Sequence, residues 1–148
     1  MDVTIQSQIL DLMNDLKKKY NMGIIMITHD LGVVAEVCSR VVVMYLGQVI
    51  EEADVHSLFE NPLHPYTKGL MKSIPQLDGD RSKKLYVIEG KVPSLHQVAK
   101  GCRFASRCDY ADQTCEQEPV LESYSSTHQI KCWHYNKIKE KEGESHVG

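Results

Sequence analysis

Apolar and polar positions alternate along the chain in a way that predicts a series of short elements, beginning with a helix over residues 4–20. Its apolar positions recur at helical spacing, with charged residues on the opposite face; they are Ile5, Ile9, Leu12 or Met13, and Leu16. Asp2 is placed to cap this helix, and lysines 17–19 stand in its last turn, where cations favour the helix dipole. Asn21 and Gly23 are expected to end it.

Three further elements are predicted in the first part of the chain. The run GIIMITHD, residues 23–30, is apolar and β-branched without alternation, which is typical of a strand covered on both faces in a parallel sheet. A short helix is predicted over residues 31–40, with Thr28 or Asp30 as its cap. Residues 40–53 form two extended runs around a Leu-Gly pair and predict a β-hairpin.

Proline and turn residues punctuate the remainder. A short helix over residues 54–61 ends at an Asn-Pro pair, and a second helix is predicted over residues 65–75 with Thr67 as its cap. One strand is predicted within residues 86–95. Residues 136–148 have no apolar pattern and are expected to form a disordered tail.

Composition and charge narrow the class of protein. The 148 residues suit about one domain, and a chain with 42% hydrophobic and 25% charged residues is typical of a folded globular protein. A formal net charge of -3 provides no electrostatic footprint for nucleic acid. No apolar stretch approaches the ~20 residues of a transmembrane helix, and the N-terminus lacks the features of a secretory signal. We therefore expect a cytoplasmic protein with reduced thiols.

Four of the five cysteines fall in one window, GCRFASRCDYADQTCEQEPVLESYSSTHQIKCW; they are Cys102, Cys108, Cys115 and Cys132. Reduced thiols disfavour disulfides, and structural zinc sites usually contain cysteine pairs separated by two to four residues, which this window lacks. Wider spacing suits separate loops that converge on a [4Fe–4S] cluster held by four thiolates. Zinc and unligated or disulfide-paired thiols are the alternatives.

Residues around the window bear on this predicted metal site. Cations beside the ligands would offset the negative charge of a four-thiolate cluster; they are Lys100, Arg103, Arg107 and Lys131. His128 and His134 flank the last cysteine and are candidates to replace one ligand. Cys38 stands apart on a predicted helix, as a small core residue does. Few large apolar residues follow residue 78, so the metal is expected to be a structural staple, with redox sensing as the alternative.

His29 follows the apolar residues 23–28 of the predicted strand and precedes a helix. In open α/β sheets ligands lie outside the carboxyl ends of the strands, where His29 is expected to project. A histidine there can donate a hydrogen bond to a phosphate or position a water molecule. The alternative is an exposed loop histidine without a role.

Two stretches resemble a known family. Residues 2–51 resemble the closing section of the nucleotide-binding domain of an ABC transporter, in which Asp2 matches the D-loop aspartate and His29, in ITHDL, matches the switch histidine. The stretch ENPLHPYTKGLMKSIP resembles the N-P-x-H-P-Y-T motif that begins the C-terminal extension of oligopeptide, dipeptide and nickel importer ATPases. The cysteine window resembles the rest of that extension, so the resemblance covers residues 2 to about 135.

The resemblance implies an α/β fold class, with a partial P-loop NTPase fold of the ABC ATPase type and a small irregular metal-stapled C-terminal extension. The implied domains are residues 1–60, the end of the nucleotide-binding domain; residues 61–135, the extension with the four-cysteine site; and residues 136–148, the tail. It assigns His29 to the γ-phosphate and attacking water, and Asp2 to communication across the ATPase dimer. Members of this importer group carry a [4Fe–4S] cluster in the extension.

Several motifs of the ABC ATPases are absent from the sequence: the G-x-x-x-x-G-K-[ST] P-loop, the Walker B pair, the Q-loop and the LSGGQ-like signature. We therefore expect a C-terminal piece of a longer protein that does not itself hydrolyse ATP, since phosphoryl transfer depends on the P-loop lysine and Mg²⁺. ATP and Mg²⁺ belong to the parent protein. Residues 23–28 would expose apolar edges, which predicts a homodimer of this chain.

The implied function is to energise ABC-type import of peptides or nickel, from the inner face of the cell membrane. The implied partners are a second ATPase subunit, two permease subunits and an extracytoplasmic substrate-binding protein. The alternative is a stand-alone iron–sulfur or zinc-binding module with no transport role. The D-loop aspartate and the switch histidine argue against that alternative.

Overall fold

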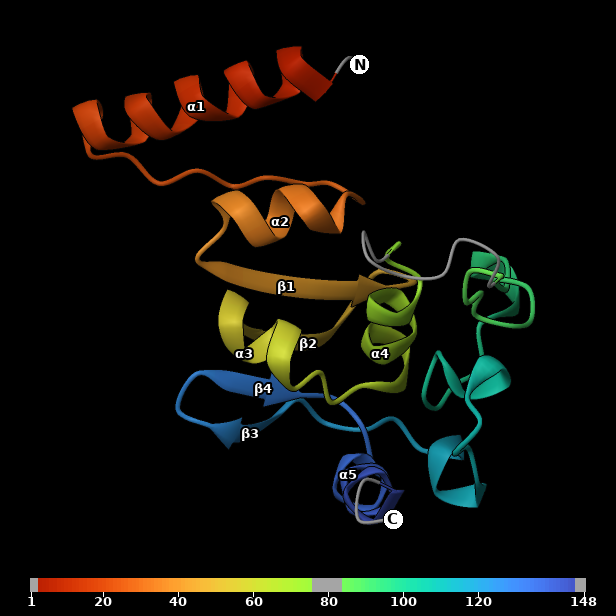
Figure 1. The fold of residues 1–148 in the computed structure, drawn as a ribbon. Helices are drawn as coiled ribbons and strands as arrows, with labels where there is room; N and C mark the ends of the chain where they lie inside the picture. The colour runs from red at the N-terminus through yellow and green to blue at the C-terminus, as the bar shows by residue number, and fades with distance from the viewer. Residues whose placement is uncertain (1–2, 76–83, 146–148) are drawn as a thin grey trace. The chain divides into compact units, whose positions relative to one another are not determined.

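The computed structural model describes residues 3–75 and 84–145, which form two compact units, one ending at Ser39 and the other beginning at Arg40 (Figure 1). Asp2, the predicted helix cap and D-loop residue, lies outside the described residues. Each unit is built mainly from contacts within itself, so each is described separately below.

The first unit begins with helix α1 (Val3–Tyr20), as the helical spacing predicts. Asn21 follows in the left-handed conformation, with φ 48, and so ends the helix where expected. Leu10 is buried within the unit, but much of the predicted apolar face is exposed, namely Ile5, Ile9 and Leu12. The helix therefore forms with most of its apolar face uncovered by the described chain.

Helix α2 (Leu31–Val37) begins at a side-chain cap supplied by Asp30. The Asp30 carboxylate accepts hydrogen bonds from the backbone N–H groups of Gly32 and Val33, at 3.0 and 3.2 Å. These bonds hold the pKa of Asp30 below its usual range. Thr28, the other predicted cap, instead accepts from the Asp30 N–H at 3.0 Å.

The predicted buried strand over residues 23–28 is wrong for the described chain. The segment is extended but belongs to no sheet, and Ile25 and Ile27 are 94% and 97% exposed. A strand requires a neighbour to receive its backbone hydrogen bonds, and the described residues contain none for this segment. The apolar side chains of this segment therefore form a surface that no other part of the described chain covers.

The second unit is built on one antiparallel sheet with the strand order β1-β2-β4-β3. Its strands are β1 (Arg40–Tyr45), β2 (Gln48–Asp54), β3 (Glu122–Ser125) and β4 (His128–Ile130). The β1–β2 pair is the predicted hairpin, whereas β3 and β4 were not predicted. Two strands from the predicted extension thus complete a sheet begun before residue 60.

A tight two-residue turn joins β1 to β2. Leu46 and Gly47 both have positive φ, at 46 and 79, as a type I′ hairpin turn requires. Glycine adopts this conformation without strain, whereas the leucine does not. The Leu46 carbonyl accepts a hydrogen bond from the Arg103 guanidinium, which joins the turn to the cysteine-containing segment.

Two short helices follow the hairpin, α3 (Val55–Glu60) and α4 (Pro65–Lys72). The Asp54 side chain caps α3, and hydrogen bonds from the side chain and backbone of Ser57 lower the pKa of Asp54 to about 2. His64, not Thr67 as predicted, caps α4 through its ring. The hydroxyl of Thr67 is fully buried and has no hydrogen-bond partner in the described part of the chain.

The predicted strand within residues 86–95 does not form. Three short 3₁₀ turns lie in this half of the unit, η1 (Leu95–Gln97), η2 (Ala105–Arg107) and η3 (Gln113–Glu116). Arg107 instead holds the extended segment, since its guanidinium donates to the Glu89 and Ile88 carbonyls at 3.0 and 3.1 Å. Side-chain anchoring replaces sheet pairing here.

Helix α5 (Tyr135–Ser145) corrects the predicted disordered tail over most of its length; residues 146–148 lie outside the described residues. Ile138, the only large apolar residue between Lys137 and Ser145 in the sequence, is fully buried. An ion pair of 2.5 Å between Lys68 of α4 and Glu142 adds a second contact. Lys139 and Tyr135 of α5 also contact Tyr124 of β3. A buried side chain, an ion pair and these contacts thus dock a helix whose sequence has no apolar stripe.

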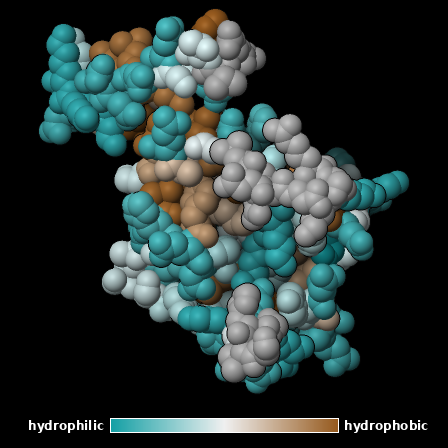
Figure 2. All heavy atoms as spheres, viewed as in Figure 1, coloured by the Kyte–Doolittle hydropathy of each residue, from teal (hydrophilic) through white to brown (hydrophobic). Residues whose placement is uncertain are grey.

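The core of the second unit lies between the hairpin, α3 and the cysteine-containing segment; its buried members are Val43, Tyr45, Ile50, Ala53, Leu58 and Phe104. Phe104 reaches this core from between Cys102 and Cys108. On the face drawn in Figure 2, hydrophobic side chains gather over β1, where Val42 and Met44 are about half exposed. No helix in the described chain is long and apolar enough to cross a membrane.

A fully buried carboxylate joins three segments of this unit. Glu51 of β2 accepts hydrogen bonds from the backbone N–H groups of Leu63 and His64, at 2.7 and 3.0 Å. It also accepts from the Nε2 atom of the buried His128 on β4, at 2.7 Å. A buried carboxylate without partners would be strongly destabilising, so these three donors make its position tolerable.

We predict that Glu51→Ala lowers the free energy of unfolding by about 3 kcal/mol, because it leaves three buried donors unpaired. The matched control is Glu52→Gln at the next position, where the side chain is partly exposed and pairs with Arg40 at 2.7 Å. The control should change stability by only about 0.5 kcal/mol. Equal losses for the two variants in urea unfolding would contradict this assignment.

Candidate metal centre

The cysteine-containing segment is closed on itself by a contact between its two halves. The Cys102 N–H donates to the Cys115 carbonyl at 2.9 Å. The preceding residue must be glycine for this approach, because a Cβ on Gly101 would lie 2.1 Å from the same Cys115 oxygen. The backbone thereby brings the first and third cysteines together.

Cys102, Cys108, Cys115 and Cys132 line one small cavity, and none of them forms a disulfide. The other lining residues include His64, Phe104, Trp133, His134 and Ile138. The sequence prediction that the four cysteines converge therefore agrees with the geometry. Cys38 is not among the residues that line this cavity; it is half-buried at the C-terminal end of α2.

Backbone N–H groups are directed at the sulfur atoms. The His134 N–H lies 3.4 Å from the Cys132 Sγ. The N–H groups of Phe104 and Ala105 stabilise the Cys102 thiolate, and that of Tyr110 stabilises Cys108. A thiol is a weak acceptor and a thiolate a stronger one, so these donors suit sulfur ligands in their deprotonated state.

Burial opposes that deprotonation in the protein alone. It raises the pKa of Cys108 to about 11 and that of Cys132 to about 12, and repulsion from the neighbouring cysteine thiolates adds to the effect. The pKa of Cys102 is raised for the same first reason. Four thiolates can share this cavity only with positive charge among them, which is what a metal ion or an iron–sulfur cluster supplies.

The dimensions of the cavity distinguish the two kinds of occupant. Its free space is about 10 Å³, room for a single water-sized atom, so a cluster would require the lining side chains to move. However, the four cysteine sulfur atoms in the described residues do not all lie within 4.8 Å of one another, as the ligands of a single metal ion would. Wide sulfur spacing fits a cluster better than one zinc ion.

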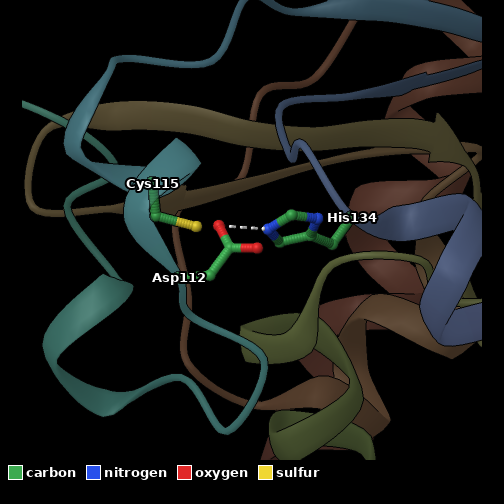
Figure 3. A group of neighbouring side chains, drawn as sticks. All are labelled: Asp112, Cys115 and His134. Carbon is green, nitrogen blue, oxygen red and sulfur yellow. Dashed lines mark hydrogen bonds and ion pairs between the residues drawn. The ribbon is translucent and has the colours of Figure 1, made fainter.

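A second group of ligand atoms overlaps this site. Asp112, Cys115 and His134 place one ligand atom each within 4.8 Å of one another, and the three side chains point toward one another in Figure 3. His134 Nε2 lies 2.9 Å from an Asp112 oxygen, and this contact lowers the pKa of Asp112. Asp112 was not predicted; it is the N-cap of η3, the 3₁₀ turn that carries Cys115.

The two histidines considered as replacement ligands separate in the structure. His134 lines the cavity, whereas His128 lies on β4 with its ring hydrogen-bonded to Glu51. The predicted cations also have other partners: Arg103 binds the Leu46 carbonyl, and Lys131 pairs with Glu118 at 2.7 Å. Lys131 still acts electrostatically on the site, since its charge favours the Cys102 thiolate.

Aromatic packing joins the cavity to the Pro-rich turn before α4. The ring of Phe104 lies 5.3 Å from Tyr45, 5.5 Å from Tyr66 and 5.7 Å from His64, measured between ring centroids. The tyrosines also pack together at 4.8 Å. The cysteine segment and the HPY sequence are therefore parts of one packed structure.

The predicted nucleotide site cannot be assembled from the described residues. His29 is exposed in the first unit, between the extended segment and α2, and does not line the cysteine cavity. Its role stays a prediction, as does that of Asp2, which lies outside the described residues.

We predict that Gly101→Ala destabilises the second unit by about 3 kcal/mol or more, because the new Cβ collides with rigid backbone. The control is Gly143→Ala in α5, where a Cβ meets nothing within 4 Å and alanine favours the helix. Urea unfolding should separate the two variants clearly. A Gly101→Ala protein as stable as the control would refute the closed conformation of the segment.

Comparison with known proteins identifies relatives of this chain. Residues 50–115 match the family described as the oligopeptide/dipeptide transporter, C-terminal region. The oligopeptide transport ATP-binding protein AppD of Bacillus subtilis is 51% identical over 136 residues, which are 91% of this chain and 41% of AppD. The protein OppD of Haemophilus influenzae, of the same description, is 45% identical over 90% of this chain and 41% of its own length.

A probable peptide ABC transporter ATP-binding protein of Sinorhizobium fredii is 48% identical over 93% of this chain and 42% of its own length. The chain thus spans about two-fifths of the curated relatives it matches. The resemblance predicted from the sequence is confirmed. Residues 50–115 match the C-terminal region of the oligopeptide/dipeptide transporter family, and the chain is similar to the C-terminal part of proteins described as ATP-binding proteins of oligopeptide and peptide transport.

Proposed function

We propose that this chain forms the C-terminal part of an ATPase subunit that energises ABC-type import of peptides, with nickel as the second candidate substrate. The observation that carries the proposal is the similarity of 91% of the chain to a protein described as an oligopeptide transport ATP-binding protein. The packed unit formed by the HPY sequence and the cysteine segment supports it, because the matched family region covers the HPY sequence and three of the four cysteines, Cys102, Cys108 and Cys115.

In the complete subunit, His29 acts at the γ-phosphate and attacking water, and Asp2 acts in communication across the ATPase dimer. ATP and Mg²⁺ bind to the longer protein, since this sequence contains no P-loop motif to hold the phosphates. The chain alone does not hydrolyse ATP. Phosphoryl transfer requires positioning and charge stabilisation that these residues do not supply.

The proposed partners are a second ATPase subunit, two permease subunits and an extracytoplasmic substrate-binding protein. The proposed location is peripheral, on the inner face of the cell membrane. The exposed Ile25 and Ile27 supply an apolar segment able to pair with another chain, which supports association of this chain with a second copy when it is isolated.

The second part of the proposal concerns the four cysteines, Cys102, Cys108, Cys115 and Cys132. We propose that they hold a [4Fe–4S] cluster, with zinc as the alternative. Directed N–H groups, a shared cavity and sulfur spacing wider than a single ion requires support the cluster. When bound, the cluster supplies the positive charge that four buried thiolates need, and it holds Phe104 in the core.

A stand-alone iron–sulfur or zinc module is the less favoured function. A stand-alone module would not be expected to resemble transport ATPases. Proteins described as transport ATP-binding proteins match between 84% and 93% of this chain. The metal site and the transport function therefore belong to one proposal.

We predict that His29→Ala in the longer protein containing this chain lowers the ATPase rate about 100-fold or more while nucleotide binding is retained. The control is His56→Ala, an exposed histidine of α3. A His29→Ala protein with the ATPase rate of the control would contradict the proposed role.

A further inference from the structure

His64 is a buried histidine that faces the cysteine cavity from the N-terminus of α4. Its residue surface is 1% exposed, and it lines the cavity together with the four cysteines. The function proposed above uses the cysteines but assigns no role to this ring. Its two nitrogen atoms have different surroundings.

The Nδ1 atom is already engaged, because it accepts the Tyr66 backbone N–H at 3.0 Å and so caps α4. An accepting ring nitrogen carries no proton. Burial lowers the pKa of His64 to about 3, so the ring is neutral near pH 7. The single proton of the neutral ring is therefore on Nε2.

This Nε2–H group has no acceptor among residues 3–75 and 84–145. The His64 ring packs against Phe104, at 5.7 Å between ring centroids, and an aromatic ring is not a conventional acceptor. Glu51 meets only the backbone N–H of His64, not its ring. A hydrogen-bond donor on a side chain that is only 1% exposed is seldom left without a partner, so an acceptor within the cavity is expected.

We infer that the Nε2–H of His64 donates a hydrogen bond to a sulfide of the cluster held by the four cysteines. The inference rests on the proposed [4Fe–4S] site and adds a positioning residue to it. Hydrogen bonds to the sulfur atoms stabilise the more negative, reduced state of a cluster and so raise its reduction potential.

Two substitutions separate the roles of the two nitrogens. Asparagine is a good helix N-cap, so His64→Asn keeps an acceptor for the Tyr66 N–H but is too short to reach where Nε2 lies. Glutamine is longer, so His64→Gln places an amide N–H near the Nε2 position and loses the cap geometry. Comparing the two variants therefore distinguishes the effect of the hydrogen bond to the site from the effect of capping α4.

The experiment is anaerobic reconstitution of the [4Fe–4S] cluster in the chain and both variants, followed by iron and sulfide analysis and redox titration. We expect His64→Asn to retain iron and sulfide. Its reduction equilibrium should shift about fivefold toward the oxidised cluster, because one hydrogen bond to the cluster is lost. His64→Gln should keep a potential near that of the wild type and lose thermal stability.

Equal potentials for His64→Asn and the wild type, or equal shifts in both variants, would overturn the inference and leave the cluster itself intact. Failure of the wild type to take up iron and sulfide would remove the proposed cluster and the inference together. A second measurement uses the wild type alone and so does not depend on a variant folding. Electron–nuclear double resonance on the reduced cluster should detect an exchangeable histidine proton, and its absence would also overturn the inference.

Discussion

The buried carboxylate of Glu51 is the interaction on which the arrangement of the second unit depends. It lies on β2 and binds the turn before α4 through Leu63 and His64, and it binds β4 through His128. Burial of a charge is tolerated only with good partners, so the three segments are held at fixed positions around one side chain. Two of these segments lead directly to the cysteine cavity.

The turn before α4 carries His64, whose ring forms part of the cavity wall. Strand β4 ends at Ile130, and the next N–H, that of Lys131, continues the pairing to the Ile50 carbonyl at 2.9 Å. Cys132 follows at once. The third contribution comes from Phe104, which fills the core beside the hairpin and holds Cys102 and Cys108 on either side of it. Thus a carboxylate and an aromatic ring together bring four distant cysteines to one cavity.

Local patterns in the sequence predicted the elements that depend on near neighbours. The hairpin around Leu46, the cap at Asp30, the short helix after Asp54 and the helix after Pro65 all follow from adjacent residues. Strands β3 and β4 were missed because they are short and polar, and they become strands because β4 pairs with β2 and β3 pairs with β4. For residues 23–28 the error was the opposite: a strand was predicted from the apolar pattern, but the described chain contains no sheet that this segment joins.

The candidate site divides in the same way. Clustering along the sequence identified the four cysteines, because their window is short. It could not identify Asp112, whose relation to His134 is a contact in space, nor Glu51, whose charge argues for exposure until its three donors are known. His64 was noticed in the sequence only as part of the HPY motif, and only the fold places its ring in the wall of the cysteine cavity.

The most direct test of this account is metal and sulfide analysis of the chain purified without oxygen, compared with two variants. The account predicts about four iron and four sulfide per chain. Cys38→Ser should keep them, because this half-buried thiol lies outside the cavity, and Cys115→Ser should lose them. One zinc ion without sulfide would contradict the cluster, and a metal-free chain of unchanged stability would contradict the metal centre altogether.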